Sequence, residues 1–434
     1  MKKNKIELFK KIFLILAFTL IIFSVSALIF LLNNSLIFQT KDILKRMILS
    51  KSLNPNNLPI LTKHKDKKKF EVFSENQRQA LLILSRYDAD LKRSIVEVID
   101  LINFEIIHTY KHNITEMNDK VRNNQRFPTN ELDNNELRFR YLHPLILGDG
   151  SLISNSGGSP LFKINLCSEL EWINEEEIFS HSIMLDKDNN IWVKGILFPP
   201  SKYLKSFGVS DVKDDAIIKL DKNGNIKYKK SVIEILIENN ILQSNFALYS
   251  KSDPIHLNDV EPAKNDSDFW KKGDLFLSLR NMSSIIHYRP STNKIINYFT
   301  GPFAEQHDVD IISDKEISIF NNNNFLTNNS HSEVLVYNFK TKNYHKLFNE
   351  QLKNENFKTE TEGLSEILID GSLLVEEGNH GRLILFNKEG KKEWEYINKG
   401  LNKKIYITHW ARIIEDKVFI NKFKSLINKK NCLN

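Results

Sequence analysis

Between Asp253 and Asn324, three apolar runs of strand type carry polar residues that could surround an anionic oxygen cluster. They supply three pairs of candidate site residues: His256 and Asn258, Arg280 and Ser283, and Gln306 and His307. Transfer of a sulfuryl or phosphoryl group needs fixed donors of this kind around a nucleophile. A neutral imidazole is a nucleophile near pH 7, and an arginine stays charged and offers a planar fork of donors. The pattern therefore predicts transfer chemistry on an anionic group.

Four histidines occupy similar places, each just before the start of an apolar run. They are His143 in RYLHPLIL, His181 in FSHSIMLD, His256 in PIHLNDVE and His307 in EQHDVDII. If these runs are equivalent strands of a ring, the four imidazoles converge on its axis. A single histidine before a strand is more often structural or solvated, so this prediction depends on the shared register. Five further histidines lack the register, and we expect them on the surface: His64, His112, His287, His331 and His345.

The elements that would position these residues are strand pairs that recur along the chain. Six copies of an apolar strand, a polar turn and a second strand end on an aromatic residue, at Tyr110, Trp172, Tyr228, Phe299, Phe348 and Tyr396. Between them lie further strand pairs whose turns, such as GDG and DGS, favour tight hairpins. A spacing of roughly 50 to 70 residues fits blades of about four strands. The sequence therefore predicts an all-β, six-bladed β-propeller over residues 74–420, with a short helix within Ser231–Leu242 and a closing strand within Ile407–Ile420.

The N-terminus has the pattern of a transmembrane anchor. Residues 1–11 carry five lysines against one glutamate, and Ile12–Leu32 is an uncharged run long enough to cross a bilayer as a helix. The positive-inside rule places residues 1–11 in the cytoplasm and the propeller outside it, in the periplasm or the extracellular space. A signal peptide cleaved near Val25-Ser26-Ala27 is the alternative. We expect residues 33–73 to form a polar stalk and residues 421–434 a loose basic tail.

Net charge, cysteine count and missing motifs exclude several classes of partner, metal site and enzyme. The net charge of +7 could indicate nucleic acid or anionic lipid, but the lysines do not gather on one predicted face, so we expect no nucleic-acid partner. Two cysteines are too few for a disulfide framework and lack the spacing of a zinc site. The segment Asp186–Asn190 lacks the glycine and the terminal glutamate of a calcium loop, which favours a hairpin turn without a metal. Phosphate-loop, GxSxG and HExxH motifs are missing from the sequence.

Three consecutive blocks of sequence resemble the arylsulfotransferase family. IHLNDVEPA, GDLFLSLRNMSSIIHY and FAEQHDVDIISDKEISIFNNN are similar to its HxNSV, SxRxxSxI, QHD and FDNG motifs, and the flanking YLHPLILGDGSLI, FSHSIMLDKDNNIWV and GLSEILIDGSLLVEEGNHGRLILF resemble its other blades. The resemblance covers roughly residues 80–415. It implies a β-propeller that moves a sulfuryl group from an aryl sulfate to a phenolic acceptor through a sulfurylated histidine, with no cofactor or nucleotide donor.

The motifs imply a role for each candidate residue. His307 would be the nucleophile, His256 and Arg280 would hold the sulfuryl oxygens, and His181 would assist proton transfer or oxygen binding. The implied substrate-binding residues are Asn258, Ser283, Gln306 and His143.

The sequence departs from the family's motifs at two places. Asp259 stands where the family has serine, and a carboxylate there would repel an anionic substrate unless it points away or pairs with Arg280. Asn321 and Asn323 replace the aspartate and glycine of FDNG, and asparagine can adopt left-handed backbone geometry at modest cost. These departures leave a second reading open, a tethered propeller without activity that acts as a binding or scaffold module. A quinone-dependent propeller would need a repeated tryptophan motif, which five irregularly placed tryptophans do not supply.

Overall fold

The computed structural model describes residues 61–74, 78–122, 126–127, 134–206, 212–241, 252–324, 331–429 and Cys432. The predicted cytoplasmic segment 1–11, the predicted anchor 12–32 and most of the predicted stalk lie outside the described residues. None of the helices within the described ranges is both long and apolar enough to cross a membrane.

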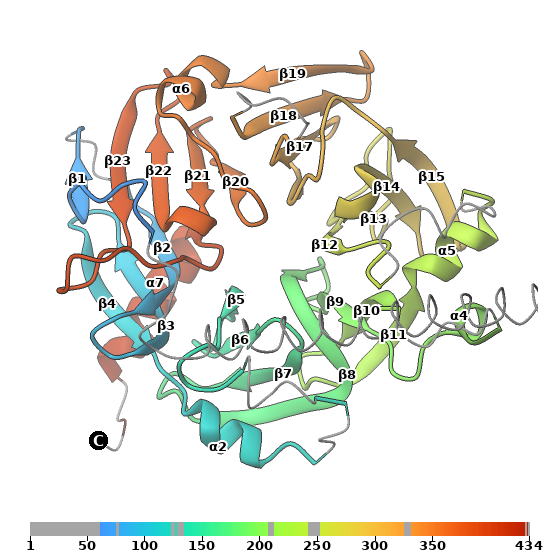
Figure 1. Ribbon diagram of the computed structural model, residues 1–434, viewed down its shortest axis with the longest axis horizontal. Helices are drawn as coiled ribbons and strands as arrows, with labels where there is room; N and C mark the ends of the chain where they lie inside the picture. The colour runs from blue at the N-terminus through green and yellow to red at the C-terminus, as the bar shows by residue number, and fades with distance from the viewer. Residues whose placement is uncertain are drawn as a thin grey trace, which may run out of the picture. The chain divides into compact units, whose positions relative to one another are not determined.

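The described chain folds mainly into antiparallel β-sheets that follow one another around a ring (Figure 1). The first sheet has the order β24 (Arg412–Ile414), β2 (Leu81–Asp88), β3 (Arg93–Asp100) and β4 (Glu105–Tyr110). A seven-stranded sheet follows, with β5 (Leu142–Ile146), β6 (Leu152–Asn155), β7 (Ser159–Ile164), β8 (Leu170–Leu185), β9 (Ile191–Ile196), β10 (Asp215–Leu220) and β11 (Ile226–Ser231). Since a ring of sheets is a propeller-like arrangement, the predicted fold class is confirmed at that level.

Three further sheets complete the ring. Two have four strands each: β12 (Leu257–Pro262), β13 (Leu275–Leu279), β14 (Ser284–Arg289) and β15 (Lys294–Phe299), then β16 (Val309–Ile311), β17 (Glu316–Asn321), β18 (Glu333–Asn338) and β19 (Asn343–Leu347). The last contains β20 (Leu364–Ile367), β21 (Leu373–Glu377), β22 (Arg382–Phe386), β23 (Lys392–Ile397) and β1 (Phe70–Val72). The C-terminal β24 pairs with the N-terminal β2, so the predicted closing strand within Ile407–Ile420 is confirmed.

Strand β8 belongs to two ladders. Its first part pairs with β7 as far as Phe179, and its second part pairs with β9 from Ile178 onward. The second ladder changes register between Ser180 and Ile183, and His181 between them has a φ of 64°. This irregularity bends the strand, as a bulge does, and sets the side chain of His181 apart from the alternation of its neighbours.

Helices and 3₁₀ turns lie between the strands, apart from α7, which follows the last strand. They are α2 (Ile114–Asp119), α4 (Lys202–Ser206), α5 (Val232–Glu238), α6 (Asn349–Asn354), α7 (Lys417–Lys429) and the 3₁₀ turns η3 (Arg280–Met282) and η4 (Gly378–His380). Helix α5 confirms the helix predicted within Ser231–Leu242. It begins where the Ser231 side chain accepts a hydrogen bond from the Glu234 backbone N–H, a favourable N-cap.

The core lies between the sheets and draws mainly on their inner and middle strands. All five residues of β13 and the first five of β14 are buried, whereas the outermost strand β15 alternates between exposed and half-buried positions. The runs of leucine and isoleucine in the middle strands follow from this, because those strands pack on both faces. Each fully buried side chain of this size contributes roughly 1.5–3 kcal/mol.

The C-terminal segment differs from the predicted loose tail. Helix α7 runs to Lys429 and buries Ile420 and Phe423 against the first two sheets, because its apolar residues recur at helical spacing. Beyond the helix, Cys432 forms a disulfide with Cys167, with a Cα–Cα distance of 5.4 Å. The count of two cysteines gave no indication of this pairing.

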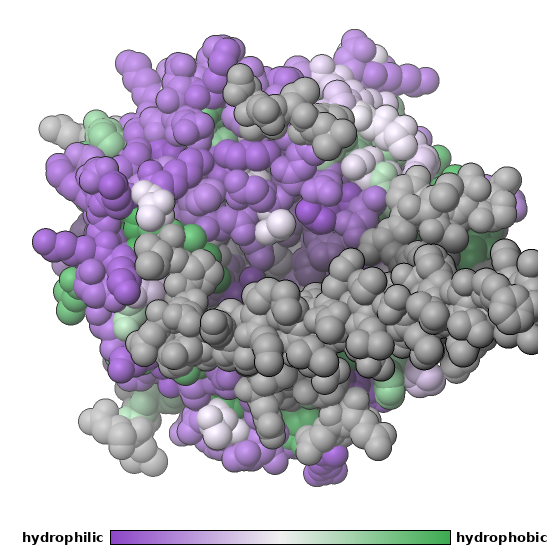
Figure 2. All heavy atoms as spheres, viewed as in Figure 1, coloured by the Kyte–Doolittle hydropathy of each residue, from purple (hydrophilic) through white to green (hydrophobic). Residues whose placement is uncertain are grey.

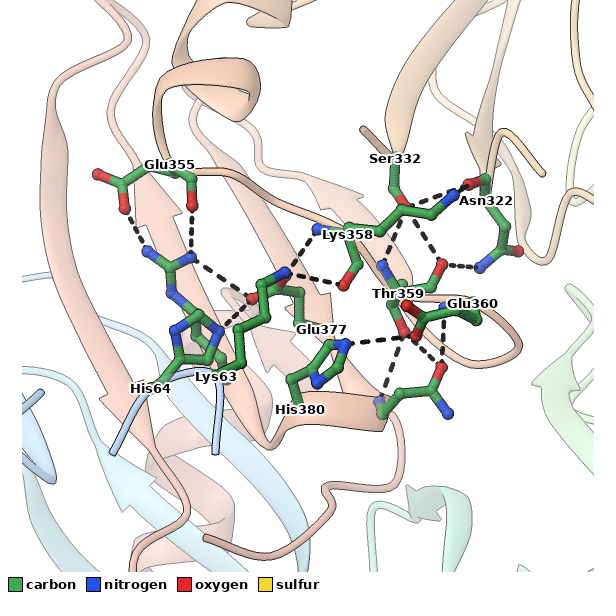
Figure 3. A network of polar contacts seen from close by, with 12 residues as sticks. Lys63, His64, Asn322, Ser332, Glu355, Lys358, Thr359, Glu360, Glu377 and His380 are labelled. Carbon is green, nitrogen blue, oxygen red and sulfur yellow. Dashed lines mark hydrogen bonds and ion pairs between the residues drawn. The ribbon is translucent and has the colours of Figure 1, made fainter. Parts of the chain in front are cut away.

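The last residues of the predicted stalk also pack on the ring. Strand β1 pairs with β23, and the segment before it joins a buried polar network on β21 and β22 (Figure 3). His64 Nε2 lies 2.8 Å from the Glu377 carboxylate, which also binds Lys63 and Arg382. His64 is therefore buried and not on the surface as predicted, since the carboxylate gives it a partner. Figure 2 shows that hydrophilic side chains cover this face over the β20–β23 sheet.

Two more histidines predicted at the surface are buried. His287 lies on β14 with its Nε2 2.8 Å from the Asp274 carboxylate, and burial lowers its pKa. His112 Nδ1 lies 2.8 Å from the Ser168 carbonyl oxygen. The partner of His112 comes from a segment 56 residues away, and that of His287 lies directly before β13, the neighbouring strand of the β13–β14 hairpin. His331 and His345 are half-buried and exposed, respectively.

Candidate active site

The innermost strands share a backbone feature. A residue with left-handed geometry lies within each innermost strand or just before it, with φ of 41° at His143, 64° at His181, 51° at His256, 53° at Glu305, 111° at Gly363 and 67° at Trp410. For a residue other than glycine this geometry costs of order 1–3 kcal/mol, and it persists only where the surroundings hold it. Because such residues gather at functional sites, the feature points to the inner edge of the ring.

The four histidines predicted to converge do lie together, with Trp410 among them. The ring centroid of His181 is 5.3 Å from that of His256 and 6.1 Å from that of His307. The indole of Trp410 lies 4.7 Å from His307, 5.5 Å from His181 and 6.3 Å from His143. Residues from five separate segments thus form one aromatic and imidazole cluster.

His307 is the most enclosed of the three rings around the tryptophan. Its backbone N–H donates to the Phe320 carbonyl oxygen at 2.9 Å. Burial lowers the pKa of His307 to about 3, helped by the charges of His256 and Arg280 and opposed by the nearby backbone of Gly363. The ring is therefore neutral at pH 7, and one of its nitrogens carries a lone pair.

Gly363, whose backbone lies near the His307 ring, has no room for a side chain. A Cβ on it would lie 2.7 Å from both the Glu376 carbonyl oxygen and the Thr359 side chain. The glycine is thus required for both its positive φ and its packing.

Gln306 and Asn258 hold the segment that carries His307. The Gln306 amide donates to the Ser278 hydroxyl at 3.1 Å and to the Ser284 carbonyl oxygen at 2.8 Å. The Asn258 amide donates to the Gln306 carbonyl oxygen at 3.2 Å. Both side chains are buried, and their hydrogen bonds hold the backbone next to His307.

Arg280 presents its guanidinium at the edge of the cluster from turn η3. One nitrogen donates to Glu305 at 2.7 Å and another to Asn281 at 2.9 Å, while its Nε has no protein partner. Ser283 ends the turn at a φ of 43°, and its hydroxyl accepts from the Glu305 backbone N–H at 3.1 Å. The predicted residue Ser283 therefore shapes the Arg280–Glu305 corner.

His256 and His181 differ in their polar partners. His256 Nδ1 lies 2.8 Å from the Asp253 carboxylate. Burial alone would raise the pKa of Asp253, but the hydrogen bond and charge of His256 outweigh it and lower that pKa below the ordinary value. Burial lowers the pKa of His181 well below 6.5, and the nearby Lys194 adds to the effect. His181 is thus neutral, and His256 is the ring oriented by a carboxylate.

The two departures from the family motifs leave the site intact. Asp259 accepts from the Val309 backbone N–H at 3.2 Å and faces the charge of Arg412, so it points away from Arg280. Asn321 accepts from the backbone N–H groups of Ala304 and Asn323, both at 2.9 Å. Asn323 has the left-handed geometry expected of it, with a φ of 55°.

An acidic cluster of buried and half-buried residues lies beside the histidines, around Arg412. Its carboxyl groups belong to Asp259, Glu261, Asp308, Asp310 and Glu366, and burial raises the pKa of each. A cavity of about 190 Å³ touches three of these acids together with Arg412 and His143. His143 therefore lies between the imidazole cluster and the acidic cavity, and not at the Arg280 corner.

No group of three histidine, cysteine or acidic side chains within the described ranges has the arrangement of a metal site. The segment Asp186–Asn190 is a hairpin turn, as favoured from the sequence. The Asp186 carboxylate accepts from the backbone N–H groups of Asp188 and Asn190, each at 2.9 Å, and pairs with Lys219. Its oxygens are therefore already engaged within the protein.

Sequence reasoning missed two residues of the site, Trp410 and Glu305. Trp410 stands before β24 as His256 stands before β12, so the register used for the histidines could have found it. Glu305 comes directly before Gln306, but only the structure shows that its carboxylate lies on Arg280.

The profile of the family described as Arylsulfotransferase (ASST) matches residues 143–399, more than half of the chain. The match includes all four histidines and Arg280 but ends before Trp410. A search of curated proteins finds no match.

Solved structures resemble the chain only distantly. A protein of unknown function from Bacteroides caccae aligns over 78% of this chain and 100% of its own, with a TM-score of 0.48 and 10% identity. TolB from Acinetobacter baumannii aligns over 78% of this chain and 66% of its own, with a TM-score of 0.43 and 10% identity. Virginiamycin B lyase from Staphylococcus aureus aligns over 59% and 70%, with a TM-score of 0.35 and 12% identity.

The acidic cluster predicts a dependence of stability on pH. Burial raises the pKa of Glu366 to about 7 from 4.5, so the folded protein holds a proton there that the unfolded chain has lost. The contribution of Glu366 to the free energy of unfolding therefore falls by about 3 kcal/mol as pH rises from 4.5 through 7. Glu366→Gln keeps an acceptor for the Ile413 backbone N–H and removes this loss. We expect the variant to gain stability relative to the parent between pH 5 and pH 8 in urea unfolding, and a constant difference would contradict the assignment.

Proposed function

The chain belongs to the arylsulfotransferase family, and we propose that it moves a sulfuryl group from an aryl sulfate to a phenol through a sulfo-histidine at His307. The observation that carries this proposal is the convergence of the neutral rings of His307 and His181 with His256, beside the Arg280 guanidinium. A buried neutral imidazole with a free lone pair is suited to attack sulfur. Arg280 supplies the fixed positive charge that the sulfuryl oxygens need.

In the first half of the reaction, the lone pair of His307 attacks the sulfur of the donor. The N–S bond forms as the bond from sulfur to the aryl oxygen breaks, and the electron pair leaves with that oxygen. We assign the proton that the phenolate takes up to His256, because Asp253 orients its ring as a carboxylate orients a catalytic imidazole. This differs from the role that the motifs implied for His256, which was to hold sulfuryl oxygens.

In the second half, an acceptor phenol takes the place of the departed one. Its oxygen attacks the sulfur, the N–S bond breaks, and the pair returns to His307. The phenolic proton passes back to His256, so the enzyme ends in its starting state. His181 stays neutral throughout and can hydrogen-bond a sulfuryl oxygen or the acceptor.

We also propose that the ring has six blades, with the seven-stranded sheet counting as two that meet in β8. The two ladders of that strand support this division, since one set of partners ends where the other begins. A density map in which β5 to β11 form one continuous blade would contradict it.

The first test of the function replaces His307. With a chromogenic aryl sulfate and a phenol, we expect His307→Ala to lose phenolate release by at least about a thousandfold, because removal of a covalent nucleophile leaves only binding effects. The exposed His345→Ala is the matched control and should keep full activity. Mass spectrometry should find a sulfuryl adduct on the parent and none on His307→Ala.

Two outcomes would change the assignment. Activity and adduct retained in His307→Ala would remove this residue from the mechanism. An intact parent that neither releases phenolate nor carries an adduct across several donors would favour a binding or scaffold propeller.

The second test concerns Glu305, whose carboxylate lies on the guanidinium that would hold the donor. An anionic sulfuryl group must displace it from Arg280. Glu305→Gln removes that competing charge, so we expect KM for the aryl sulfate to fall about fivefold, the size of a partly exposed ion pair. Glu389→Gln is the control. Glu389 is exposed, pairs with the exposed Lys388 and does not belong to the site, so this variant should leave KM unchanged. A KM that rises in Glu305→Gln would show that the carboxylate assists binding.

The third test concerns location. We propose that residues 12–32 anchor the protein and that the ring lies outside the cytoplasm, in an oxidising compartment that suits the Cys167–Cys432 disulfide. We expect the full-length protein in the membrane fraction after carbonate extraction, with a ring open to protease added from outside and both cysteines closed to a thiol reagent. Recovery in the cytoplasm with two free thiols would refute the proposal.

A further inference from the structure

Trp410 lies at the centre of the imidazole cluster but comes from a segment outside the family match. It stands just before β24, the C-terminal strand that closes the ring, while the match ends at residue 399. Its indole contacts three histidine rings, and only 3% of the residue is exposed. The closing strand therefore contributes a side chain to the site as well as completing the fold.

The backbone around Trp410 is held tightly in an unfavourable conformation. Its φ of 67° is strained for a bulky residue. The Glu376 carboxylate compensates by accepting from the backbone N–H groups of Trp410 at 2.9 Å and Ala411 at 2.6 Å. On the other side, His409 donates its backbone N–H to the Ser85 carbonyl oxygen at 2.9 Å. Partners from two other strands thus fix the indole beside His307.

The indole N–H of Trp410 is a buried donor with no protein partner. Buried donors are nearly always hydrogen-bonded, and one that is not needs an explanation. A second donor at the same site, the Arg280 Nε, is in the same condition. Both side chains act on His307, Trp410 by ring contact and Arg280 by charge. Two donors without partners in side chains that act on one imidazole fit a ligand with several acceptor oxygens.

We propose that Trp410 is a donor-binding residue whose indole N–H hydrogen-bonds an oxygen of the sulfonyl or sulfuryl group placed against His307. This inference rests on the proposed function for its reaction but names a binding contact that the family motifs do not include. The rest of the indole is in contact with three imidazoles and with Leu142 and Leu364, whereas its N–H has no partner in the protein. Indole is a donor only, which suits an anion that accepts at every oxygen.

The experiment observes the indole N–H groups directly. The full-length, ¹⁵N-labelled protein has five tryptophans, and its indole resonances are followed while benzenesulfonate is added. This probe has the anionic oxygens of the donor but a carbon–sulfur bond, so it cannot transfer. We expect the Trp410 resonance to move downfield with the largest shift of the five. We also expect Trp410→Phe to bind the probe roughly 10- to 100-fold more weakly, as for a lost hydrogen bond to a charged group.

Trp270→Phe is the matched control, since Trp270 is buried to the same extent in another cluster. It should bind the probe like the parent. The titration of the parent protein stays informative even if Trp410→Phe does not fold. The Trp410 resonance can then be assigned by elimination, by replacing the other four tryptophans one at a time. An unmoved Trp410 resonance in the presence of bound probe, equal binding by Trp410→Phe, or no binding of the probe at all would overturn the proposal.

The titration also separates this inference from the proposed reaction. A shifted Trp410 resonance in a protein that forms no sulfuryl adduct would keep the binding contact and remove the transferase. An adduct on His307 with an unmoved Trp410 resonance would keep the transferase and remove the contact.

Discussion

The site depends on left-handed backbone geometry where the chain enters each innermost strand. In a regular strand, side chains alternate between the two faces of the sheet and meet the neighbouring sheets. A positive φ at His181, His256 or Trp410 breaks that alternation and lets one side chain leave the interior of the sheets. Each such residue is strained, and hydrogen bonds from neighbouring strands hold it, as the Glu376 carboxylate does at Trp410. The functional cluster is therefore a product of strain distributed over the ring.

Burial of several imidazoles side by side is possible because they stay neutral. Desolvation lowers the pKa of His143, His181 and His307, and the neighbouring positive charges act in the same direction. The opposite holds in the acidic cluster around Arg412, where desolvation favours protonated carboxyl groups. Desolvation in the interior of the ring thus favours the uncharged form of His307 and also the uncharged form of the neighbouring acids.

The sequence predicted the strand ring, its closing strand and the meeting of four histidines, because hydrophobic alternation and register are local properties. It misplaced His64 and His287, whose carboxylate partners Glu377 and Asp274 become neighbours only through packing. It also treated the C-terminal end as a charged tail, although Phe423 and Cys432 tie that end to the first two sheets. Gln306 was predicted to bind substrate, and the folded geometry adds that its amide N–H groups donate to Ser278 and to the Ser284 carbonyl oxygen.

The changed motif residues bear on whether the site is functional or decayed. If the FDNG loop had lost its purpose, its hydrogen bonds would have no reason to persist after the aspartate and glycine were replaced. Yet Asn321 still accepts from Ala304 at the start of the segment that carries His307, and Asn323 still adopts the conformation for which glycine is suited. Asp259 likewise binds the Val309 N–H on the acidic side of the ring, away from Arg280. Each substituted residue is thus hydrogen-bonded within the protein in a way that keeps the segment around His307 in place, and this supports the proposal of an active site over that of a scaffold.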